Sequence, residues 1–149
     1  MNSKTKFSLW GSTAGGIFIA DQLIKNFLLN HPDYQGDFWF FKIHFWQNSG
    51  IAFGLPLANN LVIVISLLII LTLTLCCLRE LRNNNFVLSS YITLINYGAF
   101  SNFIDRIIHK GVIDYIDASI VPWPVFNLAD ILIVVGVLGW LIYLLRNKK

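Results

Sequence analysis

The chain has 149 residues, the length of one domain of ordinary size. Hydrophobic residues make up 56% and charged residues only 13%, whereas a typical soluble domain carries about 25% charged residues. With a mean hydropathy of +0.63, this composition excludes a disordered chain, and a net charge of +3 is too small for a nucleic-acid-binding module. The adjacent Cys76 and Cys77 also exclude a disulfide framework and a multi-cysteine metal site. We expect a polytopic membrane protein forming a single domain over residues 1–149.

Four apolar segments follow one another along the chain, and each is predicted to be a membrane-spanning helix. They cover residues 7–29, 61–78, 87–108 and 125–145. The second segment carries no charge and is long enough to cross a hydrocarbon layer ~30 Å thick. A cleavable signal peptide is the alternative for the first segment, but no small-x-small site follows its apolar core and the run continues past Asp21. The predicted fold class is therefore an all-α membrane bundle of four helices.

The basic residues predict the direction of the bundle, because cytoplasmic loops are enriched in Lys and Arg. Seven of the 11 basic residues lie before the first segment, between the second and third, or after the fourth, namely Lys4, Lys6, Arg79, Arg82, Arg146, Lys148 and Lys149. We therefore expect both termini in the cytoplasm and the connections 30–60 and 109–124 outside.

The first outer connection contains the sequence FWFFKIHF at residues 38–45, which is too aromatic for a solvated linker. Aromatic and β-branched runs favour strands, and Trp and Tyr gather at membrane interfaces. We expect a small extracytoplasmic β-rich segment over about residues 36–56, with one or two short strands lying on the membrane. This segment, with the loop through residue 54, is expected to cover a cleft.

Polar residues of three predicted helices fall at one depth. At 1.5 Å per residue, Asp21, Asn102 and Asp130 each lie ~21–22 Å from the cytoplasmic side. Helical spacing also places the polar residues of each segment on one face, as in Asp21 with Lys25, Gly98 with Asn102, Asp105 and Arg106, and Asn127 with Asp130. Such faces are expected to surround a small wet cavity in the outer third of the membrane.

A purely structural interpretation of these residues remains open. The charged residues at 21–25 and 105–106 are compatible with ion pairs, and Asn102 and Asn127 with hydrogen bonds between helices. Asp130 has no cation near it in the sequence, which favours a functional role. For Asp114 and Asp117, in the second outer connection, a solvated surface position is the ordinary expectation.

The chain lacks the motifs of most hydrolases. It contains no H-E-x-x-H or G-x-S-x-G motif and no glycine-rich phosphate loop, and its three histidines lack metal-ligand spacing. Paired carboxylates remain, because two close acids hold one proton between them and so supply both a base and an acid. The spacing leaves open which two of the outer acids form the pair: Asp21, Asp105, Asp114, Asp117 or Asp130.

Four sequence blocks resemble one known family. They are ADQLIK at residues 20–25, QNSGIAFG at 47–54, YGAFSNFIDR at 97–106 with VIDYI at 112–116, and FNLAD at 126–130. In this order they resemble signal peptidase II, the bacterial prolipoprotein signal peptidase family. The resemblance implies a four-helix intramembrane aspartyl protease of the bacterial cytoplasmic membrane. Such an enzyme cleaves a prolipoprotein before its diacylglyceryl-bearing cysteine, near the extracytoplasmic face.

The resemblance also assigns roles to individual residues. It implies that Asp114 and Asp130 are the catalytic pair, which replaces the solvated expectation for Asp114. Positions that support the site or hold substrate are Asn48, Gly98, Asn102, Asp105, Arg106, Asn127, Asp21 and Lys25. No metal or cofactor is implied, the partners are the lipid-modified precursor and membrane lipid, and we expect a monomer. Ser101 and Tyr115 depart from the family's usual Gly and Phe, which puts the fine fit of the substrate in question.

Two other functions are compatible with charged residues inside a membrane bundle. A small proton-coupled carrier or channel would use charged residues as a relay, but it predicts polar residues across the full membrane depth. Here the cytoplasmic two-thirds of the bundle is nearly free of charge. A purely structural subunit would leave Asn127 and Asp130 unexplained.

Overall fold

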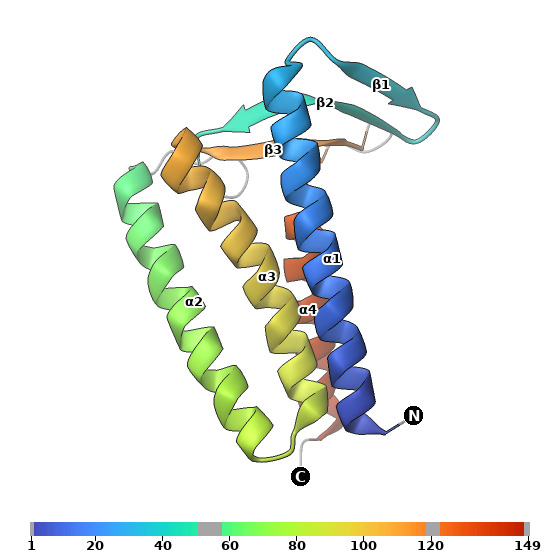
Figure 1. Cartoon of the computed structure of the whole chain (residues 1–149), viewed down its shortest axis with the longest axis vertical. Helices are drawn as coiled ribbons and strands as arrows, with labels where there is room; N and C mark the ends of the chain where they lie inside the picture. The colour runs from blue at the N-terminus through green and yellow to red at the C-terminus, as the bar shows by residue number, and fades with distance from the viewer. Residues whose placement is uncertain (1, 51–57, 119–122, 148–149) are drawn as a thin grey trace.

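The computed structural model describes residues 2–50, 58–118 and 123–147, in which four helices of alternating direction carry a small sheet across one end (Figure 1). The helices are α1 (Ser3–Asn30), α2 (Asn59–Arg82), α3 (Phe86–His109) and α4 (Leu128–Arg146), and the strands are β1 (Gln35–Phe38), β2 (Phe41–Asn48) and β3 (Val112–Asp117). The four predicted segments are therefore confirmed as helices.

Local capping explains where two helices differ from their predicted bounds. α1 begins at Ser3 rather than residue 7, because the Asn2 side chain accepts a hydrogen bond of 2.8 Å from the Thr5 amide. α4 begins at Leu128 rather than residue 125, because Asn127 forms a capping box with Asp130. Just before this cap, Phe126 pairs with Ile116 of β3 through backbone hydrogen bonds, which keeps it out of the helix.

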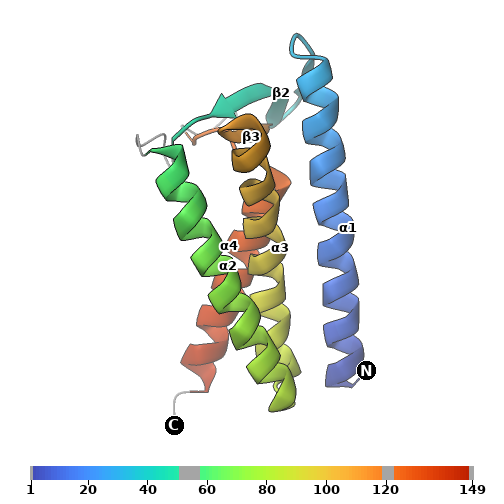
Figure 2. The ribbon, with the colours of Figure 1, turned by 60° about the vertical axis from the view of Figure 1, so that its left-hand side comes forward.

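α3 contacts the three other helices, and in the turned view it lies between α1 on one side and α2 and α4 on the other (Figure 2). Its most extensive contact is with α4, and glycines allow the two helices to approach. A Cβ on Gly136 would lie 2.6 Å from Ile95 Cγ1 and 2.8 Å from the Tyr91 carbonyl oxygen. A Cβ on Gly98 would overlap the Ala129 carbonyl oxygen. Small residues at these crossings bring the start of α4 directly onto α3.

The sheet has the order β1-β2-β3 with antiparallel neighbours. The hairpin β1–β2 confirms strands in the first outer connection, although residues 51–56 of the predicted segment, and the loop through residue 54, lie outside the described residues. β3 was not predicted as a strand. It comes from the second outer connection and pairs with β2, so that Trp46 faces Asp114 and Asn48 faces Val112.

A sharp turn joins α3 to β3. Lys110 ends the helix in the left-handed conformation with φ 59°, and Gly111 follows. A Cβ on Gly111 would lie 2.9 Å from the Asn48 carbonyl oxygen, so the glycine lets β2 pass close to the turn. The turn therefore starts β3 beside the end of β2 and brings Asp114 over the bundle.

Among the residues that the structure describes, the helices α2 and α4 are long and apolar enough to cross a membrane. Their most apolar 18-residue windows have mean hydropathies of 3.1 and 2.5, and only 11% and 17% of these windows are buried. Their apolar side chains therefore face outward, as lipid-exposed helices require. Both chain ends and the α2–α3 turn lie at the end opposite the sheet, which matches the predicted arrangement of the connections (Figure 1).

Gly136→Ala is expected to lower the free energy of unfolding by about 1–3 kcal/mol, because the new methyl group must displace the α3 backbone at Tyr91. Gly16→Ala is the matched control on α1, where a Cβ meets nothing within 4 Å. It is expected to raise stability by about 0.5–1 kcal/mol through helix propensity. Thermal unfolding of both purified variants measures the two signs, and equal effects would contradict the close α3–α4 packing.

Candidate active site

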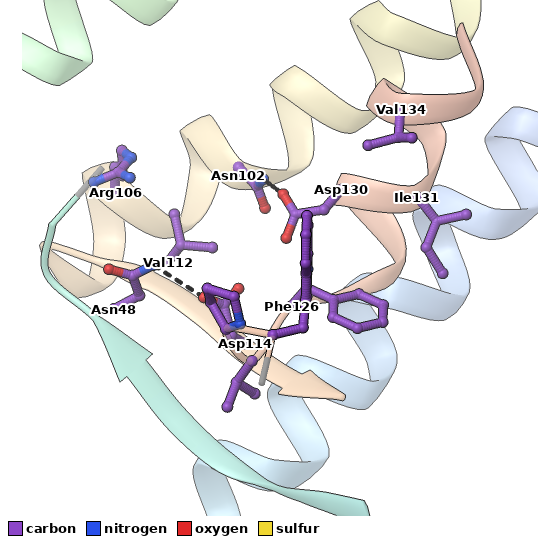
Figure 3. Close-up of a pocket in the computed structure, with 12 residues that line it drawn as sticks. Asn48, Asn102, Arg106, Val112, Asp114, Phe126, Asp130, Ile131 and Val134 are labelled. Atoms are coloured by element: carbon purple, nitrogen blue, oxygen red, sulfur yellow. Dashed lines mark hydrogen bonds between the residues drawn. The ribbon is translucent and has the colours of Figure 1, made fainter. Parts of the chain in front are cut away.

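Asp114 and Asp130 reach the same pocket from different elements. Asp114 projects from β3 and is 2% exposed, and Asp130 lies in the first turn of α4 (Figure 3). The pocket has a volume of about 530 Å³. Its polar lining residues are Asn48, Asn102, Arg106, Asp114 and Asp130, and its apolar ones are Val112, Trp123, Pro124, Val125, Phe126, Ile131 and Val134.

Asparagine side chains connect the two acids. Asn127 Nδ2 donates to Asp114 Oδ1 at 2.7 Å and to Asn102 Oδ1 at 3.1 Å. Asn102 Nδ2 in turn donates to Asp130 Oδ1 at 2.8 Å, as drawn in Figure 3. The two carboxylates are thus held by one short chain of amides, which fixes their orientation toward a shared space.

Each acid has a second fixed partner. Asn48 Nδ2, from the end of β2, donates to Asp114 Oδ2 at 3.1 Å. The Asn127 backbone amide donates to Asp130 Oδ2 at 3.2 Å, so the capping box of α4 is also part of the site. Asp130 is therefore held by the same interaction that starts its helix.

The proton affinity of Asp114 is strongly perturbed. Burial, and after it the negative charge of Asp130, raise the pKa of Asp114 from 3.8 to about 7, even though hydrogen bonds from Asn48 and Asn127 act in the opposite direction. This carboxyl can therefore keep a proton at a pH at which an ordinary aspartate is ionised. A pair of acids in this condition can both give and take a proton.

A buried ion cluster lies behind the pocket. Lys25 Nζ lies 2.7 Å from Asp21 Oδ2 and 2.8 Å from Asp105 Oδ2, and all three residues are at most 2% exposed. The ammonium group also donates to Asn102 Oδ1 at 3.1 Å. Because Lys25 binds the oxygen of this amide, the nitrogen of Asn102 is directed at Asp130.

The structure brings together the predicted site residues in three places. Asn48, Asn102, Arg106, Asp114 and Asp130 line the pocket. Asn127, Asp21, Lys25 and Asp105 support it from behind through the contacts above. Gly98 lies at the α3–α4 contact, where its lack of a side chain allows α4 to approach α3. Asp117, at the end of β3, is half-buried and does not line the pocket.

Arg106 has unused hydrogen-bonding capacity. Its Nη2 donates to the Gly50 carbonyl oxygen at 2.8 Å, whereas its buried Nη1 has no hydrogen-bond partner among the described residues. A buried, unpaired donor at the pocket wall is suited to bind a carbonyl oxygen of a ligand. The described part of the chain holds no cluster of three or more metal-ligating side chains.

Sequence reasoning missed the structural roles of Ser101 and Tyr115. Both were noted as substitutions that affect substrate fit, but neither lines the pocket. Both donate hydrogen bonds to Asp21 instead. The sequence contains one indication of these roles, because each residue is adjacent to a predicted site residue: Ser101 precedes Asn102, and Tyr115 follows Asp114.

Comparison with known proteins identifies relatives along almost the whole chain. The family model described as signal peptidase (SPase) II matches residues 13–146. The lipoprotein signal peptidase of Wigglesworthia glossinidia brevipalpis is 38% identical over 147 residues, which cover 89% of each chain. That of Staphylococcus haemolyticus is 32% identical over 141 residues, covering 89% of this chain and 88% of its own.

Solved structures match the fold as well. A bacterial membrane enzyme determined by the in meso method at 2.3 Å resolution superposes with a TM-score of 0.81 and 27% identity, covering 97% of this chain and 92% of its own. A second such structure, at 1.9 Å, gives a TM-score of 0.78. With the outward-facing apolar helices α2 and α4, these matches indicate a membrane-embedded protein. The matched family region contains both pocket acids and the amides that connect them, and the chain belongs to the signal peptidase II family.

Proposed function

We propose that this chain is an aspartic endopeptidase that removes the signal peptide from diacylglyceryl-modified prolipoproteins, cleaving before the lipid-bearing cysteine. Family membership and relatives named lipoprotein signal peptidase support the peptidase activity and the substrate class. The aspartic mechanism rests on one observation: Asp114 and Asp130 line one pocket and are connected through Asn127 and Asn102.

The mechanism follows from the shared proton. The ionised carboxylate takes a proton from a water molecule while the water oxygen attacks the scissile carbonyl carbon. The protonated carboxyl then gives its proton to the leaving amine nitrogen as the carbon–nitrogen bond breaks. The proton taken from the water restores the starting condition of the pair, so one proton is again held between Asp114 and Asp130.

The remaining pocket residues are suited to bind the peptide. Arg106 Nη1 offers a donor for a backbone carbonyl oxygen, which otherwise lacks a partner in an apolar environment. Ile131 and Val134 line the pocket and are 40% and 54% exposed on the outer surface of α4. The pocket therefore opens toward the lipid, where the acyl chains of a modified cysteine can remain.

We further propose that all four helices cross the membrane, with both termini in the cytoplasm. The charges at the sheet end of α1 and α3 face inward: Lys25 and Asp105 are 2% exposed, whereas Ile19 and Leu23 on the outer side of α1 are 58% and 64% exposed. Basic residues gather at the end of the bundle away from the sheet, which favours that end as cytoplasmic.

The single domain, the bacterial cytoplasmic membrane and the monomer belong to the same proposal. One chain supplies both acids and all of their described hydrogen-bond partners, which supports a site that is complete in a monomer. The carrier alternative is not favoured, because the relatives are peptidases and the buried ion pairs of the described residues cluster at the sheet end.

Asp114→Asn and Asp130→Asn are each expected to lower cleavage of a diacylglyceryl-modified precursor by ~10²–10⁴-fold, since each removes one half of the acid–base pair. Asp117→Asn is the matched control in the same strand, outside the pocket, and is expected to retain the wild-type rate. The gel shift of the processed precursor gives the rates. Wild-type cleavage by either pocket variant would remove that residue from the catalytic pair.

The pH profile of cleavage is expected to fall on the basic side with a midpoint near 7. The reaction needs one proton on the pair, and Asp114, with its pKa raised to about 7, loses that proton as the pH rises. Asn48→Ala removes a hydrogen bond that holds the Asp114 pKa down, so it is expected to move this limb to higher pH. Cleavage rates of both proteins, measured from pH 5 to 9 in steps of about one pH unit, test the direction of this shift. A basic limb that stays in place or moves to lower pH in Asn48→Ala would contradict it.

A further inference from the structure

Two hydroxyl groups converge on one buried carboxylate behind the pocket. Asp21, at 0% exposed, accepts from Ser101 Oγ at 2.6 Å on Oδ2 and from the Tyr115 hydroxyl at 2.8 Å on Oδ1. Lys25 occupies the Oδ2 side of this carboxylate. Among the residues that the structure describes, Tyr115 is the only hydrogen-bond donor to Oδ1.

The same tyrosine hydroxyl also holds the start of α4. It accepts a hydrogen bond of 3.2 Å from the backbone amide of Leu128, the first residue of that helix. The backbone amide of Tyr115 donates to the Phe126 carbonyl oxygen at 2.9 Å. Side chain and backbone of one residue therefore hold the segment that leads directly into Asp130.

We propose that Tyr115 is a positioning residue, whose hydroxyl fixes the first turn of α4, and with it Asp130, relative to Asp114. Tyr115 is adjacent to Asp114 in β3, so the tyrosine ties the two pocket acids together through a path separate from the asparagines. This proposal rests on the proposed aspartic mechanism, in which the separation of the two acids matters.

The direction of these hydrogen bonds is fixed. Burial and the charge of Asp21 raise the pKa of Tyr115, so its hydroxyl remains protonated and its one hydrogen is donated to Asp21. A lone pair of the same oxygen is then free to accept the Leu128 amide. Without the hydroxyl, the Leu128 amide and Asp21 Oδ1 each lose this partner in a buried site, where an unmet hydrogen bond is unfavourable.

A second consequence concerns the electrostatics of the pair. The charged groups around Asp114 are Asp130 on α4, Lys25 on α1 and Arg106 on α3, with Asp21 and Asp105 behind them. Of these charged groups, only Asp130 belongs to α4, and its negative charge raises the pKa of Asp114. If the first turn of α4 relaxes away from β3, this influence weakens together with the opposing hydrogen bond from Asn127, and because the effect of Asp130 is the larger of the two, the pKa of Asp114 falls.

The test is Tyr115→Phe in the purified full-length protein, assayed on a diacylglyceryl-modified precursor. We expect kcat to fall about tenfold, with KM within about twofold and the basic limb of the pH profile lowered by about 0.5–1 pH unit. The matched control is Tyr143→Phe, which removes a tyrosine hydrogen bond of 3.2 Å to Asn85 at the other end of α4. The control is expected to retain the wild-type kcat and pH profile.

Leu128→Pro provides an independent variant that keeps the Tyr115–Asp21 bond. Proline is favoured at the first helical position, and the substitution removes the N–H that the hydroxyl accepts. It is compared with Leu128→Ala, which retains the N–H, and is expected to reproduce the fall in kcat and the lowered limb even if Tyr115→Phe does not fold.

The failure of this inference differs from that of the proposed function. The role of Tyr115 alone would be overturned if Tyr115→Phe or Leu128→Pro kept the wild-type kcat and an unmoved basic limb of the pH profile, while Asp114→Asn, tested separately, lost activity. Equal losses in Tyr143→Phe would also overturn it, because they would indicate general loosening of α4. Full activity of Asp114→Asn would instead overturn the aspartic mechanism itself.

Discussion

The structure depends on how one buried ammonium group is neutralised. Lys25 meets the carboxylates of Asp21 and Asp105 at 2.7 and 2.8 Å inside an apolar bundle. Removing one partner of such a group leaves a buried charge uncompensated, which is strongly destabilising. The cluster therefore requires α1 and α3 to meet at this height, and Asp105 also accepts from the Ile113 amide, which attaches β3 to the same point.

The amide of Asn102 extends this constraint into the pocket. Its oxygen accepts from Lys25 and Asn127, and its nitrogen is left to donate to Asp130. A side-chain amide held at its oxygen by two donors cannot turn over without leaving both unsatisfied. The ion cluster and the acid pair therefore form one hydrogen-bonded network. The buried charges, which are unfavourable to bury, also orient the Asn102 amide that contacts Asp130.

Part of this arrangement could be predicted from the sequence. Helical spacing put Asp21 with Lys25, and Asn102 with Arg106, on common faces, and the depth estimate brought them to the level of Asp130, as their contacts confirm. Asp114 could not be found in this way. Its position depends on the pairing of β3 with β2, which are distant in the sequence, and the periodicity of hydrophobic residues within one segment does not predict such a pairing. Only the family resemblance selected it from the five outer acids.

The balance of charge at the sheet end explains why neutral donors are so numerous there. The described network contains four acids, Asp21, Asp105, Asp114 and Asp130, but only two cations, Lys25 and Arg106. Amides and hydroxyls must therefore satisfy the remaining carboxylate oxygens, as Ser101 and Tyr115 do for Asp21. The excess negative charge is not fully compensated, and uptake of one proton relieves it. The raised pKa of Asp114 follows from its burial and from this surplus of acids, so a charge balance that is unfavourable for folding helps to leave a transferable proton in the pocket.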